Sequence, residues 1–158
     1  MKQIKKHFKK YFTTEIGIEF KACLYFFAIL LYYSTYRIIG GSLDANIIVM
    51  AEIIASTYIM GYIQVYLLRN FDEAESFGPF ELVAVTGCSL VYGAESYFLN
   101  WFDKDLVVSI IFVGYMLFCY LCVIAIYYFK RLIDTELLNE ELEEFKKKGD
   151  NEDESDRD

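Results

Sequence analysis

The sequence predicts an all-α fold: an integral membrane four-helix bundle with a cytoplasmic amphipathic C-terminal helix and a disordered acidic tail. The 158-residue chain is 56% hydrophobic and 18% aromatic, which is more apolar than an ordinary soluble domain. Its charges are segregated, with lysines in the first ten residues and acids in the last thirty. Four stretches between them are long and apolar enough to cross a bilayer as helices, which takes about 20 residues each.

The four predicted spans cover residues 16–39, 46–68, 80–101 and 106–129, which together form a transmembrane domain over residues 16–129. The last span contains no charged residue, and the first is bracketed by Lys21 and Arg37, whose long side chains reach the two interfaces. Turn residues separate the spans. We expect a helix cap at Asp44 or Asn46 and a helix start at Pro79.

The distribution of lysine and arginine predicts the orientation of these spans. Basic residues are concentrated before the first span and directly after the fourth, so we expect a multi-pass protein of the cell membrane with both termini in the cytoplasm. Residues 1–15 form a basic segment that is either only the topology signal or also lies on the anionic inner leaflet. No cleavable signal peptide is expected, because a small-residue cleavage site is lacking.

Three charged residues on three predicted spans fall in one layer of the outer leaflet: Arg37, Glu52 and Glu95. A bare carboxylate in hydrocarbon costs several kcal/mol, so such residues face the bundle interior and pair with one another. The sequence therefore predicts an intramembrane charge cluster. The cluster is either a structural lock between helices or a proton or cation site of a transporter.

Other polar and small residues also predict contacts inside the bundle. Gln64 is expected to form an interhelical hydrogen bond, and Lys21 is expected near the cytoplasmic interface, where its charge reaches water or a neighbour. Small residues at helical spacing predict close helix approach. These pairs are Ala51 with Ala55, Thr57 with Gly61, and Ser89 with Gly93.

The sequence predicts neither an enzyme nor a metal or cofactor site. Cys119 and Cys122 lie in the middle of a span without a nearby histidine, which favours core packing over metal binding. The only histidine is His7 in the basic leader, and the chain lacks a phosphate-binding glycine loop. The net charge of −8 argues against nucleic-acid binding, which favours a basic face.

The chain after the fourth span divides into two predicted parts. Residues 130–148 read as a cytoplasmic helix on which Leu138, Leu142 and Phe145 form an apolar stripe at i, i+4 and i+7 among many acids. This stripe either packs back on the rest of the protein or docks a partner. Gly149 is expected to end the helix, and residues 149–158 are expected to be disordered because they are acidic and lack apolar side chains.

Several phrases resemble the bacterial membrane family catalogued as domain of unknown function 3021. They are "EIGIEFKACLYFF", "TYIMGYIQVYLLRNFDEAE", "NWFD" and "KRLIDTELLNEELEEFK", and the resemblance extends over roughly residues 11–148. Members are small four-helix proteins, many encoded beside a LytTR-type DNA-binding regulator and some beside ABC transporter genes.

The resemblance implies a regulatory membrane protein that restrains a cognate LytTR-type transcription regulator. The alternatives are an accessory subunit of an ABC transporter, or a small proton-coupled transporter that uses its intramembrane glutamates. The expected partners are therefore membrane lipid and either the regulator or ABC transporter subunits, and self-association stays open.

Overall fold

The computed structural model describes the backbone of residues 2–74 and 78–155 and the side chains of residues 11–74 and 78–143. All regular secondary structure in these ranges is helical. The elements in chain order are α1 (Lys2–Ile39), α2 (Ile47–Tyr62), the π-helical turn η1 (Ile63–Leu67), the 3₁₀ turn η2 (Phe71–Glu73), α3 (Pro79–Phe98) and α4 (Leu106–Ser155).

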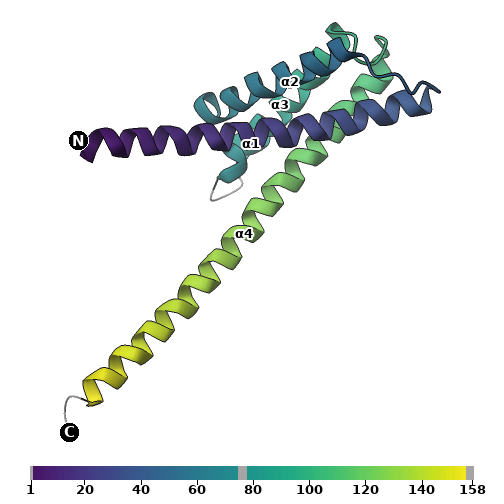
Figure 1. Ribbon diagram of the computed structural model, residues 1–158. Helices are drawn as coiled ribbons and strands as arrows, with labels where there is room; N and C mark the ends of the chain where they lie inside the picture. Colours follow the sequence, from purple (N-terminus) through teal and green to yellow (C-terminus); the bar gives the residue numbers. More distant parts are fainter. Residues whose placement is uncertain (1, 75–77, 156–158) are drawn as a thin grey trace.

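The helices form two antiparallel hairpins, because α1 packs mainly on α2 and α3 packs mainly on α4. Figure 1 shows α4 crossing α1 and then leaving the other helices behind as it continues towards the C-terminus. Loops 40–46 and 99–105 lie at one end of the bundle, which we call the two-loop end. Segment 69–74, which contains η2, lies at the opposite end, which we call the η2 end.

Three helices are long and apolar enough to cross a membrane, over Tyr11–Ile39, Ile47–Leu67 and Leu106–Glu143. These ranges agree with the first, second and fourth predicted spans and fit a membrane protein. The third predicted span, residues 80–101, corresponds to α3, which is helical over Pro79–Phe98 but less apolar. The polar and small residues along this helix include Thr86, Gly87, Ser89, Gly93, Glu95 and Ser96.

Two predicted helix starts are confirmed at the level of single residues. The Ile48 N–H donates to Asn46 Oδ1 at 2.9 Å, so Asn46, and not Asp44, caps α2. Pro79 occupies the first turn of α3, where its missing N–H leaves no internal hydrogen bond unmade. The Glu81 carboxylate accepts from the Gly78 N–H at 2.8 Å and completes that start.

The two terminal segments are more continuous than predicted. α1 begins at Lys2, so the basic segment 1–15 is part of the same helix as the first span. α4 continues from the fourth span through residues 130–148, as predicted, but it also runs past Gly149 to Ser155, where a helix end and a disordered tail are predicted. Lysine, which favours helix, is frequent in residues 2–10, and one glycine inside a helix costs only about 1 kcal/mol. Residues 156–158 of the predicted tail lie outside the described residues.

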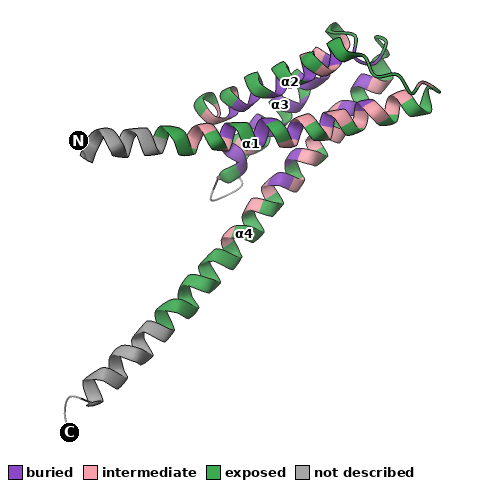
Figure 2. Ribbon diagram, viewed as in Figure 1, coloured by how far each residue is buried: buried purple, intermediate pink, exposed green. Residues whose placement is uncertain are grey.

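Large aromatic side chains fill the core. Figure 2 shows the buried residues gathered where the helices meet, whereas α4 is exposed beyond the bundle as far as its side chains are described. Near the two-loop end, the Tyr32 ring lies 5.0 Å from Phe112 and 5.3 Å from Phe102. Towards the η2 end, Phe71 of η2 packs 5.7 Å from the buried Tyr120 ring of α4. The η2 segment is therefore part of the core.

Glycines allow close approach within both hairpins. A Cβ added at Gly61 of α2 would lie 3.3 Å from Ile18 Cγ2 of α1. A Cβ added at Gly93 of α3 would lie 2.2 Å from Val113 Cγ2 of α4, which is an overlap. Ala51 and Ala55, in contrast, are exposed, so this predicted small-residue pair does not mark a close contact in the described chain.

We expect Gly93→Ala to separate α3 from α4 and to lower the free energy of unfolding by about 1–3 kcal/mol, because the β-branched Val113 has little freedom to move away. Unfolding of the detergent-solubilised protein can be followed by the fluorescence of its single tryptophan, Trp101, which is 2% exposed.

Gly114→Ala is the matched control, because a Cβ at this α4 glycine meets nothing within 4 Å. This substitution is expected to leave stability unchanged or to raise it by up to about 1 kcal/mol through helix propensity. Equal losses in the two variants would contradict a specific contact at Gly93.

Candidate functional site

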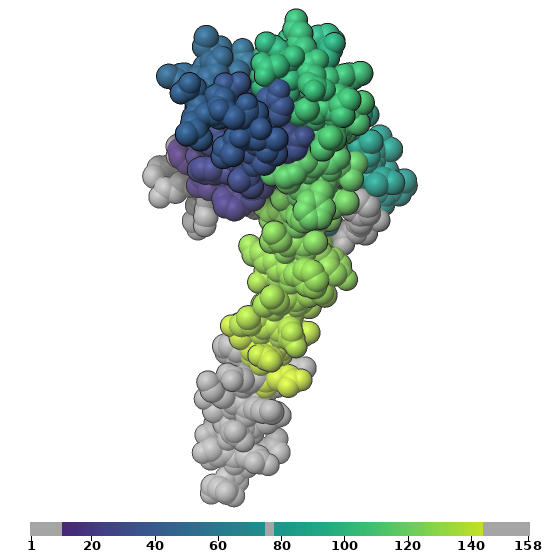
Figure 3. Space-filling view, turned by 90° about the vertical axis from the view of Figure 1, so that its right-hand side faces the viewer, coloured from purple at the N-terminus to yellow at the C-terminus, as the bar shows by residue number. Residues whose placement is uncertain are grey.

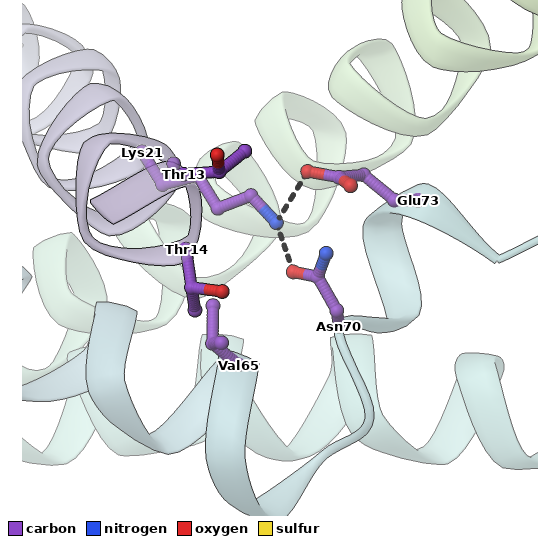
Figure 4. Close-up of a pocket in the computed structure, with 7 residues that line it drawn as sticks. Thr13, Thr14, Lys21, Val65, Asn70 and Glu73 are labelled. Carbon is purple, nitrogen blue, oxygen red and sulfur yellow. Dashed lines mark hydrogen bonds and ion pairs between the residues drawn. The ribbon is translucent and has the colours of Figure 1, made fainter. Parts of the chain in front are cut away.

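A buried lysine forms the centre of a charged cluster at the η2 end. Lys21 of α1 is 2% exposed, and its Nζ lies 2.7 Å from Asp72 Oδ1 and 3.1 Å from Glu73 Oε1. The same ammonium group donates to Asn70 Oδ1 (Figure 4). A buried ammonium needs such compensation, because its removal from water costs several kcal/mol.

The backbone between η1 and η2 aims these acceptors back at α1. Arg69 and Asn70 adopt left-handed conformations with φ of 54° and 55°, which Asn tolerates better than most residues. The Asn70 N–H donates to the Gln64 carbonyl at 2.9 Å, so the chain reverses directly after η1. Asp72 and Glu73 follow this reversal, and their carboxylates lie next to the Lys21 ammonium.

α4 joins the same segment through Arg131. Its Nη2 donates to the carbonyl oxygens of Glu73 and Ala74, both at 3.0 Å. Lys21 Nζ also lies 5.9 Å from the centre of the Tyr127 ring of α4. The charged cluster therefore contacts α1, the connection between the hairpins, and α4.

The electrostatics of the cluster centre on Asp72, which is 1% exposed. Burial raises the pKa of the Asp72 carboxyl, and the Lys21 ammonium partly opposes that shift. Asp72 Oδ2 has no hydrogen-bond partner within the described part of the protein. Since Glu73 carries a second carboxylate, the cluster holds more negative than positive groups.

A hollow of about 230 Å³ lies beside the cluster, between α1 and the η1–η2 turn. It is lined by Thr13, Thr14, Gly17, Lys21, Val65, Asn70 and Glu73 (Figure 4). Hydroxyl, amide and carboxylate groups of this kind suit water or a small polar molecule. Among the described residues, no group of His, Cys, Asp and Glu side chains is arranged to hold a metal ion.

A second polar contact lies deeper in the core. The π-helical turn η1 places Gln64 fully inside the bundle, where its Nε2 donates to the Tyr120 hydroxyl of α4. The predicted interhelical hydrogen bond of Gln64 is therefore confirmed. Gln64 Oε1 and the buried hydroxyls of Tyr25 and Tyr92 have no partner among the described protein atoms.

The three charges of the predicted outer cluster do not meet. Arg37 donates to Ser42 Oγ at 2.9 Å and lies 4.0 Å from Asp103 at the surface. The Glu52 carboxylate accepts from Trp101 Nε1 at 3.1 Å, and the Glu95 carboxylate accepts from the Ser56 hydroxyl. Each acid thus has a neutral donor in place of Arg37.

Helix rotation and the helix end explain this difference. The rise per residue sets the depth of each charge in the bundle but leaves its direction around the helix axis open. Arg37 stands in the last turn of α1 and reaches the loop that follows, where its Nε also donates to the Asp44 carbonyl at 3.3 Å.

The predicted docking stripe is solvent-facing where it is described. Leu138 is 59% exposed and Leu142 is 57% exposed. Phe145 lies outside the residues whose side chains the structure describes.

Cys119 and Cys122 are free thiols that are partly buried.

We expect Lys21→Met to lower the free energy of unfolding by about 3–5 kcal/mol, because it leaves Asp72 buried without its cation. Lys130→Met removes an exposed lysine of α4 and is the matched control, with an expected change within about 0.5 kcal/mol. Denaturant titration of the purified protein measures both changes.

The double variant Lys21→Met/Asp72→Asn is expected to recover much of the loss, since a buried ion pair and a neutral replacement differ little in net stability. A double variant as unstable as the sum of the two single variants would show that the two residues act independently.

The comparisons with known proteins add no relative. No family model matches the chain, and neither a curated protein nor a solved structure matches it. The resemblance in the quoted phrases accordingly remains a prediction, and the geometry of the chain itself supports the proposals that follow.

Proposed function

We propose that this chain is a four-span regulatory membrane protein that restrains a cognate LytTR-type transcription regulator by docking it on α4. The observation that carries the proposal is the continuity of α4. One helix runs from Leu106 inside the bundle to Ser155, and every described side chain from residue 132 to residue 143 is exposed. We call residues 132–155 the projecting segment. Figure 3 shows its described part standing clear of the bundle.

The surface of the projecting segment suits a protein partner. Five large apolar side chains on it are at least 50% exposed, namely Leu132, Ile133, Leu137, Leu138 and Leu142. Apolar side chains in water favour association, because burying them removes apolar surface from solvent. A four-helix bundle does not itself require this extension.

The charge of the projecting segment favours a basic partner. The sequence from Leu132 to Glu144 contains several acids and neither lysine nor arginine. A transcription regulator carries a basic face for the DNA phosphates. If this face is attracted to α4, the regulator is held at the membrane with its DNA-binding surface occupied.

Two features support cytoplasmic termini. The N-terminal end of α1 and the C-terminal half of α4 both extend from the bundle on the side away from the two-loop end (Figure 1). The lysines of residues 2–10, together with Lys130 and Arg131, belong to the same end, as the positive-inside tendency requires. In this topology α3 is the third span and segment 69–74 faces the cytoplasm.

The charged cluster connects the bundle to the projecting segment, so a conformational change in the bundle can reach the partner. Arg131 holds the carbonyls of segment 69–74 at the point where α4 leaves the bundle. A change in the Lys21–Asp72 contact would shift this segment and with it the direction of the projecting segment. The signal sensed within the membrane would reach the docked regulator in this way.

We expect the affinity-tagged chain, purified from its native cell in mild detergent, to bring along a LytTR-type regulator that mass spectrometry identifies. Leu138→Ser/Leu142→Ser is expected to lose the regulator, because it removes the apolar stripe. Thr135→Ser/Asn139→Ser changes two exposed, uncharged side chains of the same helix at the same spacing, leaves its acidic charge intact and is expected to retain the regulator.

Recovery of ABC transporter subunits in place of the regulator would replace this function with that of an accessory subunit. Recovery of the regulator by both double variants alike would show that the regulator does not dock on Leu138 and Leu142. Insertion of each variant in the membrane is checked by its yield in the membrane fraction.

Proton-coupled transport is a second candidate function, favoured by the unpartnered polar atoms in the core. Gln64 Oε1 and the hydroxyls of Tyr25 and Tyr92 lie buried without a partner in the described protein. Buried polar atoms of this kind bind water. Intramembrane acids such as Glu52 and Glu95 mark proton pathways in other membrane proteins.

If the chain carries protons, vesicles that contain it and a trapped pH dye should dissipate an imposed pH gradient faster than empty vesicles. Glu95→Gln is expected to abolish this flux, because the amide cannot release a proton, whereas Glu19→Gln changes an exposed glutamate and should preserve it. Equal decay with and without the protein would exclude the transport function.

A further inference from the structure

An apolar groove separates the two hairpins on one side of the bundle. Its volume is about 330 Å³, and every residue that lines it is apolar or glycine. Met60, Ile63 and Leu68 line it from α2, η1 and the residue after η1, and Phe80, Val83 and Gly87 line it from α3. The size and lining are those of a site for an apolar ligand.

The packing of the helices leaves this groove open. α2 packs on α1 and α3 packs on α4, so direct contact between the described parts of α2 and α3 is sparse. Gly87 deepens the groove, because a Cβ added at this position would meet nothing within 4 Å.

A cation stands at one end of the groove. The Arg69 guanidinium carbon lies 5.8 Å from the centre of the Phe80 ring, which lines the groove. Arg69 is exposed and forms no ion pair with any carboxylate of the described residues. It follows the apolar stretch Ile47–Leu67 by two residues, so in a bilayer it lies at the level of the lipid headgroups.

We propose that the groove binds an anionic phospholipid, with an acyl chain against the apolar residues of α2 and α3 and the phosphate on Arg69. Guanidinium groups bind phosphate oxygens in a planar, two-point geometry. The apolar lining and a cation that pairs with no carboxylate of the described residues together match the two halves of one lipid molecule.

Native mass spectrometry of the detergent-purified chain tests the proposal, with phosphatidylglycerol as the anionic probe and phosphatidylcholine as the zwitterionic one. The wild type is expected to retain phosphatidylglycerol at least about tenfold better, as expected for a charge-assisted contact. Arg69→Gln is expected to lose this preference while it keeps residual binding of both lipids.

Gly87→Phe tests the groove itself, because the new ring would occupy the space assigned to the acyl chain. Gly114→Phe is the matched control, since this glycine of α4 is also exposed and also has nothing within 4 Å of a Cβ. We expect Gly87→Phe to abolish lipid retention and Gly114→Phe to preserve it, with equal helix content by circular dichroism in both.

Three results would overturn the proposal. The first is equal retention of the two lipids by the wild type. The second is undiminished phosphatidylglycerol binding by Gly87→Phe. The third is a wild-type dimer that Gly87→Phe dissociates, because a second copy of the chain would then occupy the groove.

Discussion

The architecture depends most on the contact between the Lys21 ammonium and the Asp72 carboxylate, both almost fully buried. A buried charge needs an opposite charge beside it. Segment 69–74 therefore packs against α1 and does not extend from the bundle as a free loop. It folds back, brings Phe71 against Tyr120, and places two carbonyl groups within reach of Arg131. One ion pair thereby fixes the connection between the two hairpins.

The two ends of the bundle are closed by different forces. Rings of Tyr32, Phe102 and Phe112 interlock at the two-loop end, where the ion pair between Arg37 and Asp103 lies at the surface. Exposed ion pairs such as Arg37 with Asp103 contribute little to stability. The two-loop end is therefore held by packing, whereas the η2 end is held by buried charge and by hydrogen bonds to backbone carbonyls.

Local sequence signals predicted the helices well. Apolar length predicts four spans, of which three are helices long and apolar enough to cross a membrane. Side-chain chemistry predicts the cap at Asn46, the start at Pro79 and the interhelical bond of Gln64. These features depend on residues near one another in the chain or on a single buried amide. α1 begins before the predicted first span, because lysine in the preceding segment favours helix, and α4 continues past Gly149, because one glycine inside a helix costs only about 1 kcal/mol.

Contacts distant in the chain were harder to predict. The rise of a helix predicts the depths of Arg37, Glu52 and Glu95 in the bundle but not the directions in which their side chains point. Their partners in the structure therefore differ from the predicted ones. Lys21 was assigned to the interface because lysines usually reach water there. The one signal for its burial was a lysine among apolar residues, and nothing local marks Asp72, which lies 51 residues away, as its partner.

The continuity of α4 also has a mechanical consequence. From Arg131 to Ser155 the helix extends for about 36 Å at its usual rise of 1.5 Å per residue. A tilt of about 10° at the bundle would therefore displace the far end by roughly 6 Å, about the pitch of one helical turn. A rigid helix of this length converts a side-chain rearrangement near Arg131 into a movement of its far end that is large enough to separate two protein surfaces.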